Sequence, residues 1–341
     1  MVQETTQGDL YYGRTMEFGF ELDSVVSVVP RALALNGTGM ANQTGLESGG
    51  MKWTSKYAFT AMNALGEMTA VDGVNEKGLV CGLLYFPNYA NYSDAATADP
   101  ETALAPWTFC SWALSLFQTV DEVRNATSAI SVVGLTLSAP GFSEELPAHW
   151  TLHDATGKSI VVEPVEQTLK VYDNPFRAMT NAPEFPWHVT NIANYVKLSP
   201  YNAPPLELAG QVIQSFGEGS GWLGLPGDMT PPSRFIRAIA GSMTSVEIGS
   251  NSTDTAVRLV EHIMNDFDIP QAMIRDNATD VADYTQWTTI ADLQTCKYYV
   301  KTYNDQMLQS VDLFKFDLDA DHIVSAPIVD HLAVPALPFV S

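Results

Sequence analysis

Basic residues are scarce in this 341-residue chain. It holds 17 lysines and arginines against 39 aspartates and glutamates, which gives a formal net charge of −22 at pH 7 and a pI near 4.4. A field of that sign repels the phosphate backbone of nucleic acids and the surface of anionic membranes. The sequence therefore predicts a protein that binds no nucleic acid.

Cysteine and the usual metal-binding patterns are also sparse. The three cysteines, Cys81, Cys110 and Cys296, are too few and too widely spaced for a disulfide framework, and no CxxC pair indicates zinc. The six histidines form no HxH or HExxH pattern. No serine lies in the GxSxG elbow that is typical of α/β-hydrolases. We therefore predict no metal and no cofactor.

Long apolar runs are missing as well. No stretch approaches the roughly 20 residues that a membrane-spanning helix needs, and the first residues lack the charged-then-apolar pattern of a signal peptide. No repeat of about 20 to 50 residues and no low-complexity linker divides the chain. With 46% hydrophobic residues, the sequence predicts one soluble domain over residues 1–341, without a membrane span.

Strand-like segments come in groups. Residues 9–18 and 24–33 are rich in aromatic and β-branched residues, and residues 78–86 form a nearly continuous apolar run. Residues 149–173 predict a meander of three strands, and residues 285–316 predict a second meander. The short turns between these strands indicate antiparallel pairing.

Helical periodicity appears between these groups. It covers residues 107–127, residues 233–245 after a Pro-Pro pair, and residues 253–267 behind a Ser/Thr cap. Helices that separate groups of antiparallel strands, rather than alternating singly with strands, are typical of an α+β fold. Sheets that are apolar on both faces indicate helix layers outside two stacked sheets.

Arg14 and Glu17 are charges on an otherwise apolar ribbon. In a regular strand they would point to opposite faces, and a turn or bulge after Arg14 would be needed to bring them together. A solvated edge of the sheet is the plain alternative.

Two further polar residues stand at the ends of predicted elements. Asn181 ends a strand, either as an ordinary turn former or as an amide that donates to a developing oxyanion. Arg234 lies in the first turn of a helix, where a basic residue opposes the helix dipole, so we expect a partner to hold it there. Exposure among tight turns is the alternative. The preceding glycines match neither GK[ST] nor GxGxxG, so no phosphate loop is predicted.

Four stretches, taken in order, resemble the choloylglycine hydrolase family, which contains bile salt hydrolases and penicillin V acylases. They are GDLYYGRTME, DGVNEKGLVCGLLYFP, TNAPEFPWHVTN and GLPGDMTPPSRFIR. The resemblance runs across nearly the whole chain. It implies an N-terminal-nucleophile hydrolase with a four-layer αββα sandwich of two antiparallel sheets, in agreement with the α+β pattern.

The resemblance also implies a mechanism. In this family a mature N-terminal cysteine attacks an amide, and its own α-amino group serves as the base. An α-amine titrates at roughly pH 7.7 to 8, so a useful neutral fraction exists without a histidine. The sulfur forms an acyl-enzyme, which water then hydrolyses. This mechanism requires no metal.

Carried over by position, the resemblance assigns roles to five residues. Arg14 matches the arginine beside the nucleophile, and Glu17 stands where the family typically has Asp, so the added methylene would rearrange its contact with the α-amine. Asn181 matches the oxyanion-hole asparagine, which a backbone N–H near Tyr85 completes. Arg234 matches the arginine near the thiol.

The resemblance places the nucleophilic cysteine about three residues before Met1. The cysteines present are expected in a strand (Cys81), a helix (Cys110) and a late strand (Cys296), and none can substitute for it. Three explanations are compatible with this. The natural protein carries a cysteine-containing leader, the protein is a paralogue that has lost the reaction and keeps the pocket, or the chain has been trimmed.

The substrate prediction depends on Tyr85. Bile salt hydrolases usually carry Asn at this position and penicillin V acylases usually carry Tyr, which favours an acylase that cleaves an apolar or aromatic acyl amide. A bile salt hydrolase, an N-acyl homoserine lactone acylase and a catalytically dead ligand-binding homologue are the alternatives. Met16 and Phe18, which flank Glu17, are expected to line the acyl pocket. Ordinary core packing is the alternative for both.

The resemblance further implies an oligomer and a bacterial setting. A protruding segment at about residues 191–214 mixes apolar and proline-rich sequence and could pack against a neighbouring copy. We therefore expect a homo-oligomer, either a tetramer or a dimer. The compartment expected from the resemblance is the periplasm or the cytoplasm.

Overall fold

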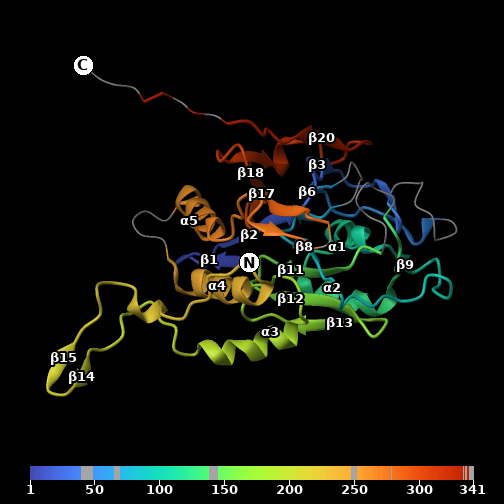
Figure 1. Ribbon diagram of the computed structural model, residues 1–341. Coiled ribbons are helices and arrows are strands. Elements are labelled where there is room, and N and C mark those ends of the chain that lie inside the picture. Colours follow the sequence, from blue (N-terminus) through green and yellow to red (C-terminus); the bar gives the residue numbers. More distant parts are fainter. Residues whose placement is uncertain are drawn as a thin grey trace.

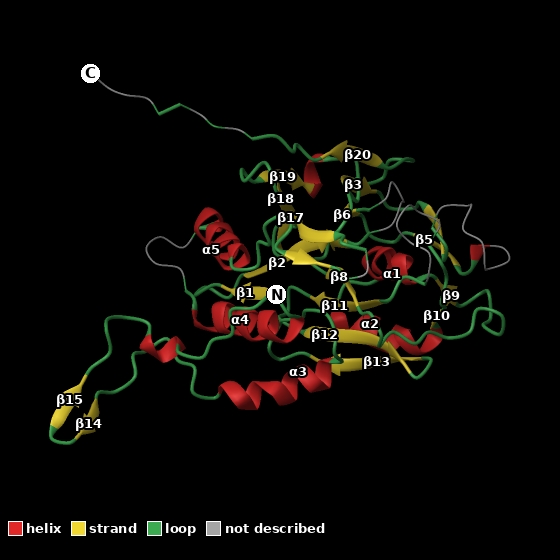
Figure 2. Ribbon diagram, in the orientation of Figure 1, coloured by secondary structure: helices red, strands yellow, loops and turns green. Residues whose placement is uncertain are grey.

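Two antiparallel sheets lie against each other, and helices cover the outer face of each sheet (Figures 1 and 2). The computed structural model describes residues 1–39, 49–64, 70–137, 145–246, 252–277, 279–332, 334, 336 and 337. The order of the layers is helix, sheet, sheet and helix. This order confirms the predicted α+β sandwich.

The six-stranded sheet pairs strands from the two ends of the chain. Its centre is formed by β2 and β17, which run antiparallel over most of their length. Its path runs through β1 (Val2–Glu4), β2 (Leu10–Phe18), β17 (Ala282–Asp292), β18 (Lys297–Thr302) and β19 (Gln309–Asp312), and β16 (Ile274–Arg275) pairs with the start of β17. The last three strands on this path confirm the meander predicted at residues 285–316.

The eight-stranded sheet holds the first predicted meander at one edge. Its spatial order is β13 (Thr168–Asp173), β12 (Ser159–Val165), β11 (Ala148–His153), β8 (Val80–Tyr85), β7 (Asp72–Asn75), β6 (Phe59–Met62), β3 (Val25–Val29) and β20 (Val324–Pro327). Every neighbouring pair in it is antiparallel.

Among the described residues, three smaller pairs of strands accompany the two large sheets. They are β4 (Ala34–Asn36) with β5 (Lys52–Thr54), β9 (Ala103–Leu104) with β10 (Ser131–Val132), and β14 (Leu206–Leu208) with β15 (Gln211–Ile213). The hairpin β14–β15 lies within the predicted protruding segment, and it projects away from the two sheets (Figure 1). Its strands are exposed throughout.

The helices form the two outer layers. The eight-stranded sheet is covered by α1 (Phe109–Leu116) and α2 (Val120–Ala126), and the six-stranded sheet by α4 (Pro231–Thr244) and α5 (Thr253–Asn265). Helix α3 (Phe185–Asn191) packs beside α4 and was not predicted. None of the helices in the described ranges combines the length and apolar character needed to cross a bilayer.

Local sequence explains where these helices start. Ser252 and Thr255 form a capping box at the start of α5, and α4 begins at Pro231, whose missing N–H costs nothing in a first turn.

The run predicted as one helix at residues 107–127 is two helices, which corrects the prediction. The chain is extended at Phe117, and the Thr119 side chain caps α2 by accepting from the Glu122 N–H.

A second correction concerns Cys296. The sequence predicts it in a late strand, but it lies in the turn between β17 and β18, with φ of 56°. The sequence does not indicate this turn, because its four residues include neither glycine nor proline and the residues on both sides are typical of strands.

A buried carboxylate links the two sheets. Asp72, in β7, accepts hydrogen bonds from the hydroxyls of Tyr12 (2.8 Å), Tyr298 (2.6 Å) and Thr289 (2.8 Å), all of which belong to the six-stranded sheet. Burial raises the pKa of the Asp72 carboxyl above its ordinary value. The three hydroxyl donors offset part of the cost of burying this group, and they fix how the sheets lie on each other.

We expect Tyr298→Phe to lower the free energy of unfolding by about 2 kcal/mol, because it removes a hydrogen bond to a buried carboxylate. Urea unfolding at pH 7 measures this change. The control is Tyr201→Phe, whose side chain is 79% exposed and should change the stability by less than about 0.5 kcal/mol. Equal stability of the two variants would contradict the assigned role of Asp72.

Candidate active site

A cavity of about 840 Å³, with mostly apolar walls, opens at the end of β2. All seven residues predicted as site residues border it. They come from β2, from β8, from the loop before α3 and from the first turn of α4. These residues are Arg14, Met16, Glu17, Phe18, Tyr85, Asn181 and Arg234. The fold therefore brings together side chains that lie up to 220 residues apart in sequence (from 14 to 234).

Strand β2 presents its two faces to different layers. The hydroxyl of Tyr12 meets Asp72 of the other sheet, whereas Gly13 faces α5 so closely that a Cβ there would lie 2.7 Å from Val260. By this alternation Arg14 and Glu17 belong to opposite faces, as a regular strand requires. Both still border the cavity, because it surrounds the end of the strand.

The bulge near Arg14 and Glu17 lies in the partner strand β17 and not in β2. In the pairing of β17 with β2, Thr285 faces Glu17 and Trp287 faces Met16, so Gln286 is the extra residue. Strand β2 itself is continuous from Leu10 to Phe18. The local change of register therefore belongs to β17, immediately beside Glu17.

The guanidinium of Arg14 is almost fully buried and bridges the sheets. Its Nη1 donates to the carbonyl oxygens of Val71 and Leu83, each at 2.9 Å, and lies 3.9 Å from a carboxylate oxygen of Asp72. Its planar group lies over the ring of Trp287, 5.3 Å from the centroid. Arg14 thus contributes a fixed positive charge to the cavity wall while its hydrogen bonds serve the fold.

Glu17 stands on an acidic wall of the cavity. Its Oε1 accepts a hydrogen bond from the hydroxyl of Thr285 at 3.0 Å. Asp276 and Asp283 border the same cavity. Burial, together with the charges of Glu17 and Asp276, raises the pKa of Asp283. A group that approaches this wall meets carboxylates, which favour a neutral or cationic group over an anion.

The amide of Asn181 is held in one orientation. Its Oδ1 accepts from Nη2 of Arg234 at 2.6 Å, and its Nδ2 donates to the carbonyl of Tyr85 at 2.7 Å. Nε of Arg234 also donates to the Met229 carbonyl at 3.0 Å, and burial lowers the pKa of this guanidinium. Arg234 is therefore the residue that fixes which side of the amide carries the N–H groups. One N–H serves Tyr85, and the amide carries a second.

Two buried histidines, to which no sequence pattern gives a role, support the loop that carries Asn181. Nε2 of His188 lies 2.9 Å from the carbonyl oxygen of Asn181, and Nε2 of His149 lies 3.0 Å from that of Thr180. Nδ1 of His149 faces Oε1 of Glu163 at 3.2 Å. A sequence pattern does not reveal such residues, because they act on backbone carbonyls rather than on a metal or a substrate.

Met1 borders the cavity from the first strand. Its α-amino group donates to the Gly13 carbonyl at 2.7 Å, which continues the pairing of Val2 with Tyr12. Burial lowers the pKa of this amine to about 5; the Asp72 charge opposes the shift and Arg14 adds to it. An α-amine buried at this position is therefore neutral at pH 7.

None of the three cysteines borders the cavity. Cys81 in β8 and Cys110 in α1 are fully buried, with their sulfurs 3.1 Å apart. Burial raises the pKa of Cys81 well above its ordinary value and that of Cys296 to about 11. Cys81 and Cys296 are therefore neutral thiols at pH 7, and Cys110 lies in the core against Cys81. Their positions agree with the expectation that none of them replaces the nucleophile.

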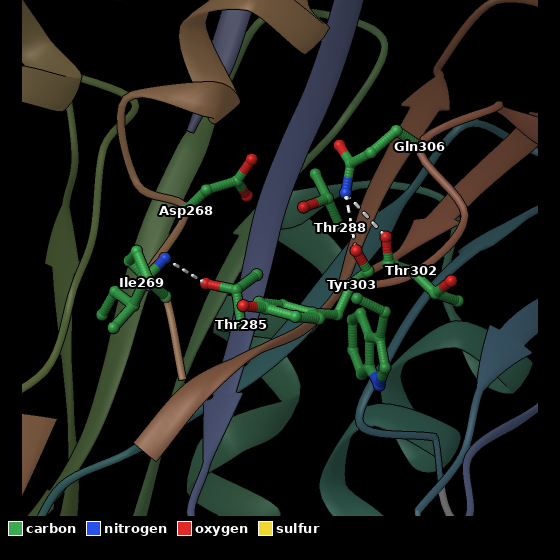
Figure 3. A pocket seen from close by; sticks show the side chains of 9 residues that line it. Asp268, Ile269, Thr285, Thr288, Thr302, Tyr303 and Gln306 are labelled. Atoms are coloured by element: carbon green, nitrogen blue, oxygen red, sulfur yellow. Dashed lines mark hydrogen bonds between the residues drawn. The ribbon is translucent and has the colours of Figure 1, made fainter. Parts of the chain in front are cut away.

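A second, smaller cavity of about 110 Å³ lies between Asp268, Tyr303 and Gln306 (Figure 3). Thr285 lines it, and the Thr285 hydroxyl accepts from the Ile269 N–H at 2.9 Å and donates to Glu17 in the larger cavity. Gln306 closes another side by donating to the Thr302 carbonyl. Within the described ranges, no group of three or more His, Cys, Asp and Glu side chains is placed to hold a metal ion.

Comparison with known sequences gives one consistent result. A family model described as linear amide C–N hydrolases, choloylglycine hydrolase family, matches residues 1–326. A bile salt hydrolase/transferase of Clostridium perfringens is 34% identical over 330 residues, covering 94% of this chain and 93% of that protein. A penicillin V acylase of Pectobacterium atrosepticum is 24% identical, covering 89% of this chain and 77% of that protein.

Solved structures agree with the sequences. A crystal structure of a single-residue variant of conjugated bile acid hydrolase from Clostridium perfringens superposes with a TM-score of 0.85 at 30% identity, covering 99% of both chains. The structure of penicillin V acylase from Agrobacterium tumefaciens has a TM-score of 0.75 at 20% identity, covering 96% of this chain and 90% of that chain. The second likeness bears on the fold alone.

The buried position of His188 predicts a pH-dependent stability. Burial lowers the pKa of His188 to about 4, whereas an unfolded histidine titrates at about 6.5. The unfolded chain therefore binds this proton first, and stability falls as the pH drops from 6.5 towards 4. The expected loss is roughly 3 kcal/mol. Urea unfolding at several pH values measures it.

His188→Gln removes this titration and should reduce the slope of the profile between pH 6.5 and 4, while the contribution of His153, whose pKa burial also lowers well below its ordinary value, remains. The matched control is His322→Gln, since the His322 side chain is 69% exposed. Its profile should follow that of the unmodified protein. If the His188→Gln profile also runs parallel to the unmodified protein, the histidine does not titrate as its burial requires.

Proposed function

The chain belongs to the choloylglycine hydrolase family of linear amide C–N hydrolases, and from that premise we propose that the 840 Å³ cavity is the active site. The proposed substrate is an amide with a bulky apolar or aromatic acyl group. The observation that carries this proposal is the convergence of Arg14, Glu17, Asn181 and Arg234 on one largely apolar cavity.

We place the nucleophile three residues ahead of Met1, as a cysteine at the mature N-terminus. The register of the first two strands supports this position. Val2 pairs with Tyr12, and Met1 bonds to Gly13, so three more residues in the same register end opposite Met16. Met16 borders the cavity beside Glu17. A sulfur at that point would lie in the cavity, next to the acidic wall.

In the proposed reaction the cysteine sulfur attacks the amide carbonyl, and the α-amine takes the thiol proton. The amine then gives a proton to the departing amine of the substrate, and water hydrolyses the acyl-enzyme. An α-amine titrates at roughly pH 7.7 to 8, and the fixed positive charge of Arg14 disfavours protonation of a nearby amine, which supports this role.

The second N–H of the Asn181 amide is the proposed donor to the oxyanion. Arg234 holds Oδ1 and the Tyr85 carbonyl takes one Nδ2 hydrogen, so the amide cannot turn away without losing both bonds. A donor fixed before the reaction stabilises the developing charge without reorganisation. A backbone N–H near Tyr85 is the proposed second donor.

Two features favour an aromatic acyl group, as in penicillin V. The ring of Tyr85 is 42% exposed at the cavity and meets Phe18 edge to face, with centroids 6.1 Å apart. Edge-to-face rings accept a further flat ring readily. The acidic wall of Glu17, Asp276 and Asp283 disfavours any anionic leaving group, which includes glycine, taurine and the carboxylate-bearing amine of penicillin V, so it favours amides of an uncharged amine.

A conjugated bile salt is the second candidate substrate. Two observations favour it: the cavity volume of about 840 Å³ lies at the upper end of the range for small-molecule sites, and the Clostridium perfringens relative that shares 34% identity is named a bile salt hydrolase/transferase. An N-acyl homoserine lactone would use the same apolar wall. A catalytically dead ligand-binding homologue remains the alternative from another class.

We also propose that the protein is a homo-oligomer, a dimer or a tetramer, of single-domain subunits. The hairpin β14–β15 supports this, because its exposed side chains include Leu206, Leu208, Val212 and Ile213. A projecting apolar hairpin is costly in a monomer. Sedimentation of the full chain at several concentrations tests this proposal.

The proposed function predicts turnover by a chain that starts with cysteine three residues ahead of Met1. Its kcat/KM should be higher for phenoxyacetyl amides than for glycine or taurine conjugates of bile acids, because of Tyr85 and the acidic wall. The matched control carries alanine in place of that cysteine and should bind substrate without turnover. A preference for the conjugates would establish the second candidate. Saturable binding without turnover by the cysteine form would overturn the proposed hydrolase.

The oxyanion assignment predicts an ordered loss of kcat. Asn181→Ala should lower kcat by roughly 100- to 1,000-fold, because it removes the donor. Arg234→Met should lower kcat by roughly 10- to 100-fold, since the amide then loses its fixed orientation. Steady-state kinetics measures both.

The control is Arg258→Met, because Arg258 lies on α5 with a side chain that is 62% exposed; kcat should stay within about twofold of the unmodified enzyme. In the double variant of Asn181 and Arg234 the losses should not add, because the arginine acts through the amide. Additive losses would contradict the proposed role of Arg234.

A further inference from the structure

The bulge in β17 directs one side chain out of the sheet pairing. Gln286 is the extra residue between Thr285 and Trp287, so it has no partner position in β2. Its side chain is nevertheless only 8% exposed. A bulge re-aims a side chain, and such features are typical of sites where a strand serves more than its own ladder.

The side-chain amide of Gln286 forms hydrogen bonds with the end of β2 and the loop that follows it. Its Nε2 donates to the carbonyl of Phe20 at 2.6 Å and lies 3.2 Å from that of Phe18. Its Oε1 accepts from the N–H of Leu22 at 3.2 Å. One side chain thus bonds to three backbone groups within five residues, and the loop at residues 18–22 takes its shape from that side chain.

This loop forms a wall of the active-site cavity. Phe18, Phe20 and Leu22 all border the cavity. The rings of Phe18 and Phe20 meet edge to face, with centroids 4.8 Å apart, and Phe18 meets Tyr85 in the same way. Because Nε2 of Gln286 bonds to the backbone carbonyls of both Phe18 and Phe20, the rings of these two residues keep a fixed spacing. The shape of this aromatic wall therefore depends on Gln286, which does not itself line the cavity.

We infer that Gln286 is a specificity-determining positioning residue: through the backbone of residues 18–22 it sets the shape of the wall that receives the acyl group. This inference rests on the proposed amide hydrolase function. An acyl group large enough to reach Phe18 and Phe20 gains from the fixed wall, whereas an acetyl group does not reach it. Loss of the anchor should therefore change selectivity between acyl groups rather than the chemical step.

The test uses two variants of the cysteine-bearing enzyme. Gln286→Met keeps the length and approximate volume of the side chain and removes all three hydrogen bonds. Gln286→Glu keeps the shape and the acceptor for Leu22, but it replaces the donor by an oxygen that faces the carbonyls of Phe18 and Phe20. A role in packing alone would leave Gln286→Met, which keeps the volume, close to the unmodified enzyme. The anchoring role requires both variants to change in the same direction.

The readout is kcat/KM for amides that share one chromogenic amine and differ in the acyl group: acetyl, octanoyl and phenoxyacetyl. We expect the ratio of phenoxyacetyl to acetyl to fall by about tenfold or more in both variants, through KM, while kcat for the acetyl amide stays within about twofold. Unchanged selectivity in both variants, or an equal loss of kcat on all three amides, would overturn the inference.

The matched control is Gln294→Met. Gln294 lies in the turn at the other end of β17, where its Oε1 accepts from the Leu10 N–H at 2.9 Å, and it does not border the cavity. Gln294→Met loses the hydrogen bond between its side chain and the Leu10 N–H of β2, whereas the Gln286 variants lose hydrogen bonds to the loop after β2. The acyl selectivity of Gln294→Met should not change. A shift equal to that of Gln286→Met would show that any such loss disturbs the cavity.

A second readout separates this inference from the proposed function. Titration calorimetry with phenoxyacetate and acetate measures binding of the acids without turnover. If the unmodified protein hydrolyses none of the amides, the proposed function fails. Weaker binding of phenoxyacetate by Gln286→Met, with Gln294→Met unchanged, would then still support the anchor. Equal binding by all three proteins would overturn it.

Discussion

The buried carboxylate of Asp72 is the constraint on which the cavity depends. It takes three hydroxyl hydrogen bonds from the opposite sheet, and Arg14 adds a second tie by bonding to the carbonyls of Val71 and Leu83. Both ties link the six-stranded sheet to residues on or beside β7 and β8. They hold the end of β2 at a fixed place relative to Tyr85, two residues beyond Leu83. The cavity is the space between these strand ends.

The charges around the cavity divide into two groups with different duties. Arg14 donates to backbone carbonyls and Arg234 donates to the Asn181 amide. Their positive charges therefore affect the electrostatic potential in the cavity, but neither guanidinium is placed to bind a substrate carboxylate with two hydrogen bonds. The carboxylates of Glu17 and Asp283 border the same cavity. In a chain with a net charge of −22, these two arginines place positive charge in a cavity that also carries the carboxylates of Glu17, Asp276 and Asp283.

The sequence predicted what depends on local pattern. Strand alternation, the two meanders and the caps of α4 and α5 follow from neighbouring residues. The family resemblance predicted that Arg14 and Asn181 belong to one site, and both border the cavity. The failures concern contacts between distant segments. The bulge lies at Gln286 rather than after Arg14, because the register belongs to a pair of strands and not to one. The supporting histidines were missed since their partners are carbonyls, which every residue has.

Two of the loops that border the cavity are held from outside by side chains that bond to their carbonyls: Gln286 for residues 18–22, and His149 with His188 for the loop around Asn181. Residues that face the cavity set the chemistry of its walls, whereas these anchors set the spacing of the walls. A substitution at an anchor can therefore change acyl preference while every lining residue stays the same. A comparison restricted to lining residues, such as Tyr85, would miss such a change, and substrate preference within one fold has to be argued from both sets.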